Sequence, residues 1–145
     1  MTCAGNGYYR QWSLLIVCFN LFSYDEALRL WDTRNMAQPL KEFGLGGGVW
    51  RIKWRQPDFA AVACMHNGFS IVDCHIGTED PMEVVCSYGE HKSLAYGIDW
   101  CRLTHPTLAQ PDATEDPSEL ALLSSCSFYD HLLHLWTAKL PSILQ

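Results

Sequence analysis

At 145 residues the chain has the length of one ordinary domain. It carries 16 acidic and 10 basic residues, which gives a net charge of −6, and 48% of its residues are hydrophobic. This composition argues against a disordered chain, which combines low hydrophobicity with high net charge, and against a nucleic-acid-binding protein, which normally has a basic surface. The longest apolar run, residues 14–19, is too short for a membrane-spanning helix of roughly 18–20 residues.

The seven cysteines include no Cys-x-x-Cys pair, so the sequence has no zinc-binding pattern. We interpret them as small buried residues of a protein in a reducing cytosol. The amino-terminal apolar run is interrupted at Asn20 and is followed by no small-residue cleavage site, so we expect no secretory signal. These features predict a cytoplasmic protein.

Apolar residues at alternating positions predict short β-strands from residue 27 onwards, since alternation is the period of a strand with one buried face. Residues 14–22 are apolar and compatible with a further strand ahead of them. The pair Asn67-Gly68 predicts a type I′ hairpin turn. In chain order we expect strands at 27–32 and 40–43, then at 49–54, 59–65, 69–73 and 82–86, and finally at 94–101, 120–127 and 132–137.

Several of these elements repeat. Residues 24–31 (YDEALRLW) match residues 129–136 (YDHLLHLW), and residues 66–73 (HNGFSIVD) are a looser copy of both. Residues 49–54 (VWRIKW) and 95–100 (AYGIDW) form a second repeated element. Each copy of the first element is a polar turn followed by alternating apolar residues, which is typical of a repeated antiparallel hairpin.

The spacing of the repeated turns identifies the fold. Asp25 and Asn67 are 42 residues apart, and Asn67 and Asp130 are 63 apart. Treating the Pro-rich stretch 104–119 as an insertion restores a period within the 40–45 residues of WD repeats. The sequence therefore predicts an all-β partial WD-repeat β-propeller of about two and a half blades, each a four-stranded antiparallel sheet. The expected parts are an unmatched leader at 1–22 that supplies a strand, the partial propeller at 23–137, and a tail at 138–145.

In a WD-repeat blade, a His before the first strand, an Asp in the second turn and a Trp on the third strand share a buried hydrogen-bond network. The third blade offers His91, Asp130 and Trp136 for these places, and the first blade offers Asp25 and Trp31. An incomplete network of this kind would leave buried polar groups without hydrogen-bond partners, which destabilises the fold. We therefore favour a structural role over a catalytic one for these residues.

Specific strings in the chain resemble a known family of WD-repeat proteins. They are SYDE at 23–26, RLWDTRNM at 29–36, GGVWRIKW at 47–54, ACMHNGF at 63–69 and CSFYDH at 126–131. Together they resemble the carboxy-terminal blades of the diphthine methyltransferase family. The resemblance covers residues 23–137, with 104–119 as its weakest part.

The resemblance implies a hydrolase. Members of this family are methylesterases of diphthamide biosynthesis, which hydrolyse the methyl ester of diphthine methyl ester on translation elongation factor 2 to give diphthine. The implied partner is elongation factor 2, and no metal or organic cofactor is implied. Two alternatives stay open: a family member that has lost the esterase activity because the chain is truncated, and a non-catalytic WD-repeat protein-interaction module, since propellers host many functions.

The residues offer several weak candidates for ester hydrolysis, which needs a nucleophile, a base and a donor for the oxyanion. The hydrolase motif G-x-S-x-G is absent. Glycines 46–48 could supply backbone donors, although a loop is the favoured interpretation. His131 and His134 point to opposite faces of a strand and make a poor metal pair. Candidate nucleophiles are Ser23, Cys64, Cys126 and Ser127, and candidate bases are His66 and His131, with a solvated turn as the competing interpretation of His66.

A stack of two and a half blades cannot close into a ring, and ring closure is what removes exposed sheet edges. We therefore expect an open stack with an exposed edge at each end. The isolated chain is expected to aggregate or to elute as an oligomer.

Overall fold

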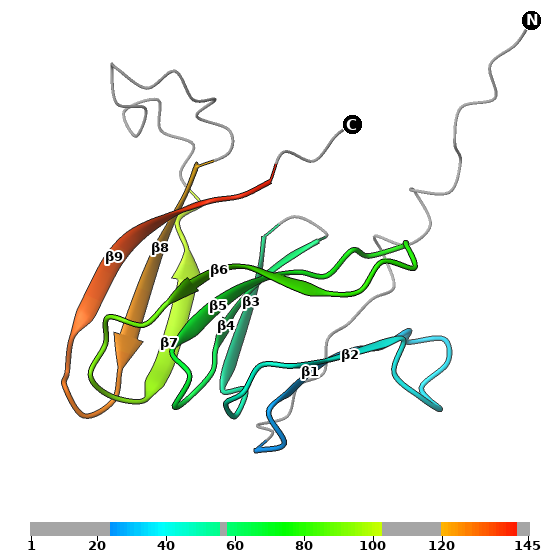
Figure 1. Ribbon diagram of the computed structural model, residues 1–145, viewed down its shortest axis with the longest axis horizontal. Helices are drawn as coiled ribbons and strands as arrows, with labels where there is room; N and C mark the ends of the chain where they lie inside the picture. Colours follow the sequence, from blue (N-terminus) through cyan, green and yellow to red (C-terminus); the bar gives the residue numbers. More distant parts are fainter. Residues whose placement is uncertain (1–23, 56–57, 103–119, 142–145) are drawn as a thin grey trace, which may run out of the picture.

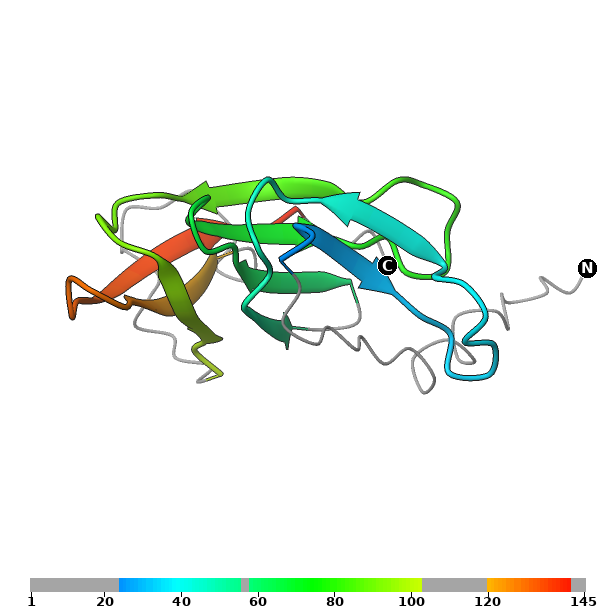
Figure 2. The same cartoon turned by 90° about the horizontal axis from the view of Figure 1, so that it is seen from below.

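A computed structural model describes residues 24–55, 58–102 and 120–141. These residues form three antiparallel β-sheets that lie one after another (Figure 1), and the view turned by 90° keeps the same order (Figure 2). The described residues include no helix, and hence none long and apolar enough to cross a membrane. The leader at 1–22, the insertion at 104–119 and the end of the tail lie outside the described residues.

Strands that are neighbours in the sequence are neighbours in every sheet, which is the meander of a propeller blade. The first sheet has two strands, the middle sheet four and the third sheet three. The strands are β1 (Ala27–Leu30) and β2 (Lys41–Gly44); β3 (Arg51–Arg55), β4 (Phe59–Ala63), β5 (Phe69–Asp73) and β6 (Glu83–Tyr88); and β7 (Ala95–Trp100), β8 (Leu120–Ser127) and β9 (Leu133–Lys139). The prediction of an all-β chain with partial propeller blades is confirmed.

The turn between β4 and β5 differs from the prediction, and the predicted type I′ turn at Asn67-Gly68 is wrong. The positive φ angles fall at Met65 (39°) and Gly68 (70°). The Asn67 amide donates to the Cys64 carbonyl (2.7 Å), and the Cys64 amide donates to the Gly68 carbonyl (2.8 Å). The loop is therefore longer than two residues, and the Asn67 side-chain amide donates to the Leu45 carbonyl (2.6 Å). That contact ties the turn to the segment between the first two sheets.

The middle sheet is covered on both faces, which explains why β4 is a continuous apolar run rather than an alternating one. Ala60 and Val62 pack against the first sheet, where they meet Leu28 and Leu30. Residues on the opposite face pack against the third sheet. In this second cluster Phe59, Phe69 and Ile71 of the middle sheet pack with residues of the third sheet. The third sheet contributes Trp100, Leu123 and Trp136.

Two side chains also join neighbouring sheets by hydrogen bonds to backbone carbonyls. The Lys41 ammonium on β2 donates to the carbonyls of Cys74 (3.1 Å), His75 (2.7 Å) and Asp80 (2.7 Å) in the loop after β5. The indole N–H of Trp100 on β7 donates to the Lys53 carbonyl on β3 (2.7 Å). Through these bonds the first sheet is held to the loop after β5, and the third sheet is held to β3 of the middle sheet.

The outer face of the third sheet is apolar and exposed. Leu133 and Leu135 on β9 come directly after the Asp130 turn of the third blade. They occupy the same positions as Leu28 and Leu30 on β1, which come after the Asp25 turn of the first blade. Leu28 and Leu30 are 0% and 1% exposed because the middle sheet packs on them, whereas Leu133 and Leu135 are each 68% exposed. Within the described part of the chain, the stack of blades is open at this face.

Candidate functional site

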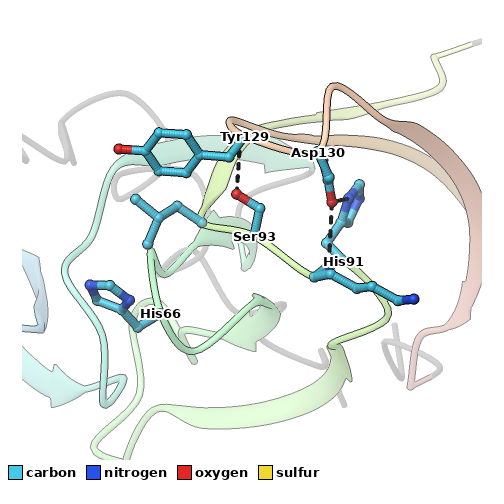
Figure 3. Close-up of a pocket in the computed structure, with 7 residues that line it drawn as sticks. His66, His91, Ser93, Tyr129 and Asp130 are labelled. Carbon is cyan, nitrogen blue, oxygen red and sulfur yellow. Dashed lines mark hydrogen bonds and ion pairs between the residues drawn. The ribbon is translucent and has the colours of Figure 1, made fainter.

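Three connections meet at one end of the middle and third sheets and enclose an open cavity of about 600 Å³. They are the β4–β5 turn, the β6–β7 connection and the β8–β9 turn. In Figure 3, His66 and Tyr129 lie on one side of the cavity, and His91 and Asp130 lie on the other. The lining residues are His66, His91, Lys92, Ser93, Leu94, Tyr129 and Asp130.

Beneath the cavity, His91 is the centre of a hydrogen-bond network that runs from β9 to the β8–β9 turn. Its Nε2 lies 2.9 Å from the Ser125 hydroxyl, which accepts a hydrogen bond from the Trp136 indole N–H (3.1 Å). Its Nδ1 lies 2.7 Å from the Ser127 hydroxyl, which donates to the Asp130 carboxylate. The His91 side chain is only 2% exposed, so this network is buried. The structure thus brings His91, Asp130 and Trp136 together.

The donors and acceptors in this network fix one tautomer of His91. The Ser127 O–H donates a hydrogen bond to Asp130, so the Ser127 oxygen accepts one from the N–H at His91 Nδ1. Ser125 accepts from Trp136, which leaves its own O–H to donate to Nε2 of a neutral imidazole. Burial lowers the pKa of His91, with the nearby His134 as the next cause, and both favour this neutral form.

Asp130 is the charged end of the network. Its carboxylate also accepts hydrogen bonds from the amides of Leu132 (3.1 Å) and Lys92 (3.3 Å). The hydrogen bond from Ser127 is the largest cause of a lowered pKa of Asp130. The carboxylate therefore fixes the β8–β9 turn and holds the β6–β7 connection beside it.

The network differs from a catalytic Ser-His-Asp triad. In such a triad the carboxylate orients the imidazole and the other ring nitrogen faces the nucleophile. Here Asp130 accepts a hydrogen bond directly from the Ser127 hydroxyl, and Nε2 of His91 is hydrogen-bonded to Ser125. With the Ser127 hydroxyl directed to a carboxylate and 7% of the residue exposed, this arrangement positions the turn rather than activating a nucleophile.

The structure places the other candidate residues at separate positions. His66 projects from the β4–β5 turn and lines the cavity, while His131 is exposed in the β8–β9 turn with a φ of 55°. Cys64 is 0% exposed, and burial raises the pKa of its thiol to about 11, which opposes thiolate chemistry. Cys126 is half-buried on β8, and Ser23 lies outside the described residues.

Glycines 46–48 form a loop between β2 and β3 that packs closely on the β4–β5 turn. A Cβ atom at Gly47 would collide with the Cys64 carbonyl, and Gly46 has a φ of 69°. Both positions therefore need glycine for close packing and backbone conformation.

The first blade contains the equivalent turn but not the equivalent network among its described residues. The Asp25 carboxylate accepts the amide of Ala27 (3.3 Å) and pairs with Arg29 (2.5 Å). Trp31 is half-buried just after β1. The structure describes no residue of the first blade in the places that His91 and Ser125 hold in the third.

Comparison with known proteins gives one consistent result. No family model matches the chain, and no solved structure matches it. The chain is 44% identical over 102 residues to diphthine methyltransferase of Homo sapiens and 40% identical over 104 residues to that of Mus musculus. It is 37% identical over 121 residues to the diphthine methyltransferase homolog of Dictyostelium discoideum. These segments cover 68%, 69% and 79% of the chain.

The chain belongs to the diphthine methyltransferase family. The family suggested by the sequence motifs is thereby confirmed. The chain spans 23%, 22% and 30% of the three relatives, less than a third of each.

Sequence reasoning missed three members of the cluster around His91. Ser125 was not predicted, although β8 alternates buried and half-buried residues and Ser125 falls on the buried face. A serine on the buried face of a strand needs a hydrogen-bond partner, and that was the available signal. Tyr88 and His134 were also missed. The Tyr88 hydroxyl lies 2.9 Å from His134 Nδ1, and the Tyr88 ring stacks on Trp136 with centroids 4.6 Å apart.

The described residues contain no group of three or more His, Cys, Asp or Glu side chains that could hold a metal ion. His131 lies in the β8–β9 turn rather than on a strand, so strand alternation does not describe this pair, while His134 lies on β9 and stacks on His91.

Proposed function

We propose that this chain forms part of a cytoplasmic methylesterase site, which hydrolyses the methyl ester of diphthine methyl ester on elongation factor 2 to diphthine during diphthamide biosynthesis. Membership of the diphthine methyltransferase family supports the substrate class. The single structural observation that carries the proposal is the open cavity at the loop end of the blades, which exposes His66 beside a turn held rigid by Asp130.

His66 is the group in this cavity that best suits general-base catalysis. Both ring nitrogens of His91 are engaged by serines, so His91 cannot take a proton without disrupting the network. His66 is exposed and lines the cavity, so a bound ester and a water molecule can approach it together. In this proposal His66 takes the proton of the attacking water as the water oxygen bonds to the ester carbonyl carbon. The protonated His66 then returns that proton to the methoxy oxygen as its bond to the carbonyl carbon breaks, so the products are the free carboxyl group and methanol. Lys92, which also lines the cavity, supplies a positive charge for the oxyanion.

The test is methanol release from elongation factor 2 that carries methylated diphthine. We expect the chain to release methanol and His66→Gln to lower the rate at least about 100-fold, the usual contribution of a general base. His131→Gln is the matched control, because His131 lies in a neighbouring turn but does not line the cavity. An equal loss in both variants would remove His66 from the mechanism. No methanol release, with a full-length relative active in the same assay, would contradict an autonomous catalytic site in this chain.

The second candidate function, a protein-interaction module, rests on a row of contacting aromatic rings. Tyr96 lies 5.3 Å from Trp50 and 5.3 Å from Phe128 between ring centroids, and Phe128 lies 4.8 Å from Tyr129. Tyr96, Phe128 and Tyr129 are 39%, 50% and 70% exposed. Exposed aromatic residues are common anchors of protein interfaces.

This candidate predicts that the chain binds elongation factor 2 without hydrolysing the ester. Phe128→Ala with Tyr129→Ala would then weaken binding at least about tenfold in a calorimetric titration, while His66→Gln would leave it unchanged. If the chain releases methanol, and the variant with Phe128→Ala and Tyr129→Ala binds elongation factor 2 as well as the unmodified chain, the results would favour the esterase over the interaction module.

A further inference from the structure

The two sides of the cavity are an aromatic ring and a carboxylate. In Figure 3 Tyr129 lies on one side of the cavity and Asp130 on the other. Both residues line the cavity, and Tyr129 is 70% exposed. The face of an aromatic ring is electronegative and a carboxylate carries a full negative charge, so both sides attract a cation.

The charge of Asp130 is not neutralised by a basic side chain. Among the described residues, its one ion-pair contact is with His91 (3.7 Å), whose buried ring is held neutral by its surroundings. Lys92 bonds to the carboxylate through its backbone amide (3.3 Å) rather than its ammonium. In the equivalent turn of the first blade, by contrast, Asp25 pairs with Arg29 (2.5 Å). The third-blade turn therefore presents a negative charge that a bound cation can balance.

The Asp130 carboxylate has little capacity left to accept hydrogen bonds. It already accepts them from the Ser127 hydroxyl and from the amides of Leu132 (3.1 Å) and Lys92 (3.3 Å). These three donors use most of the about four lone-pair sites of a carboxylate. A primary ammonium or a guanidinium brings N–H groups that each need an acceptor, whereas a quaternary ammonium brings none. Asp130 thus suits a cation that needs charge but no hydrogen bond.

The aromatic side of the cavity is held in place by the neighbouring connection. The Tyr129 amide donates to the Ser93 hydroxyl oxygen (2.9 Å), and the Phe128 amide donates to the Leu94 carbonyl (3.1 Å). The Tyr129 and Phe128 rings are in contact, with centroids 4.8 Å apart and an angle of 83° between their planes. A ring anchored in this way loses little conformational freedom when a ligand binds, which favours affinity.

We propose that this cavity binds a methylated ammonium group, with the Tyr129 ring on one side of the cation and the Asp130 carboxylate on the other. Aromatic faces bind quaternary ammonium ligands through cation–π contacts. The inference rests on the proposed function in one respect, because the same cavity holds the ester that His66 attacks. A ligand that fills both parts carries a quaternary ammonium and an ester together, and the cation positions the ester.

Three small probes that differ in one group test the cation. Choline carries a trimethylammonium group, dimethylbutanol is its uncharged tert-butyl isostere, and ethanolamine carries a primary ammonium on the same chain. Ligand-observed NMR titrations of the full chain measure their dissociation constants, and they also work if the chain self-associates. We expect choline to bind at least about fivefold more tightly than either of the other probes, since only choline combines charge with a surface free of N–H donors.

Substitutions of Tyr129 test the ring. Tyr129→Leu keeps an apolar side chain without a π face, so it should weaken choline binding at least about threefold and leave dimethylbutanol binding nearly unchanged. Tyr129→Phe keeps the face and should bind choline as the unmodified chain does. Tyr24→Leu is the matched control, because Tyr24 precedes Asp25 in the equivalent turn and is 75% exposed but is not part of the cavity lining.

Equal affinities for choline and dimethylbutanol, or equal effects of Tyr129→Leu and Tyr24→Leu on choline binding, would overturn the cation site. Ethanolamine binding as tight as that of choline would overturn the assignment to a methylated ammonium. The measurement is independent of ester hydrolysis. A chain that binds choline but releases no methanol would keep the cation site and lose the esterase, and the reverse result would remove the cation site alone.

Discussion

The imidazole ring of His134 lies against that of His91, with centroids 3.9 Å apart and an angle of 19° between the planes. Burial of His91 opposes a proton on its ring, and the proximity of His134 opposes it further. The buried network that supports the cavity therefore depends on a histidine kept neutral by its surroundings.

This arrangement predicts a loss of stability in mild acid. An unfolded histidine has a pKa of about 6.5, and the pKa of His91 in the folded chain is lower. As the pH falls through that interval, the unfolded chain binds a proton that the folded chain does not, so the free energy of unfolding decreases. His134→Gln removes one of the two causes that lower the pKa of His91. The variant should therefore lose less free energy of unfolding between about pH 7.5 and about pH 5.5 than the unmodified chain. Urea unfolding at the two pH values measures this, and an equal loss in both proteins would contradict it.

Removal of the Ser125 hydroxyl should destabilise the third blade. Ser125→Ala leaves the Trp136 indole N–H and His91 Nε2 without their shared partner, and Ser125 is 1% exposed. We expect the free energy of unfolding to fall by about 1–3 kcal/mol, the usual cost of a buried unsatisfied group. Ser124→Ala, on the half-buried face of the same strand, is the control and should cost less than about 0.5 kcal/mol. Similar losses in urea unfolding for both variants would argue against the network.

Lys41 should stabilise the loop after β5 more than an ordinary surface lysine would. Lys41→Met removes a charged donor from three backbone carbonyls and should lower the free energy of unfolding by about 1–3 kcal/mol. Lys53→Met is the matched control, since Lys53 and Asp99 form an exposed ion pair (3.0 Å) worth about 0–1 kcal/mol. Amide exchange in residues 76–80 should become at least about tenfold faster in the Lys41 variant alone. Unchanged exchange there would show that the loop does not depend on Lys41.

The exposed leucines of β9 should drive self-association of the isolated chain. Leu133→Glu with Leu135→Glu places charge on an apolar face, so we expect the oligomer or aggregate of the unmodified chain to shift toward a monomer in size-exclusion chromatography with light scattering. Met36→Glu with Leu40→Glu changes two residues that are also about half exposed, 49% and 48%, but lie between β1 and β2. An equal effect of the two pairs, or a monomeric unmodified chain that melts cooperatively near about 55 °C, would contradict this prediction.

The strands were predictable from the sequence because their signals are local. Alternation along residues 120–127 and the repeated turn before β1 and β9 need no knowledge of distant residues. The β4–β5 turn was not predictable, because the Asn67 side chain bonds to the Leu45 carbonyl, 22 residues earlier in the chain.

The candidate site was predictable only in part for the same reason. His91, Asp130 and Trp136 follow from the spacing of a repeat, whereas the contact of Tyr88 with His134 joins residues 46 apart and has no repeat signature. The cavity itself arises where the turns of two different blades meet, which no single repeat encodes.

The meander order of the strands has a consequence for how the chain is made. Every hydrogen-bonded strand pair joins strands that follow one another in the sequence, within the part of the chain that the structure describes. Contacts between strands that are close in sequence form early in folding, since the entropy lost in closing a loop grows with its length. During synthesis the amino-terminal part of a chain emerges first, so the middle blade can pair its strands before the whole third blade has left the ribosome. The two core clusters then form in sequence, as each new blade emerges and covers the face of the one before it.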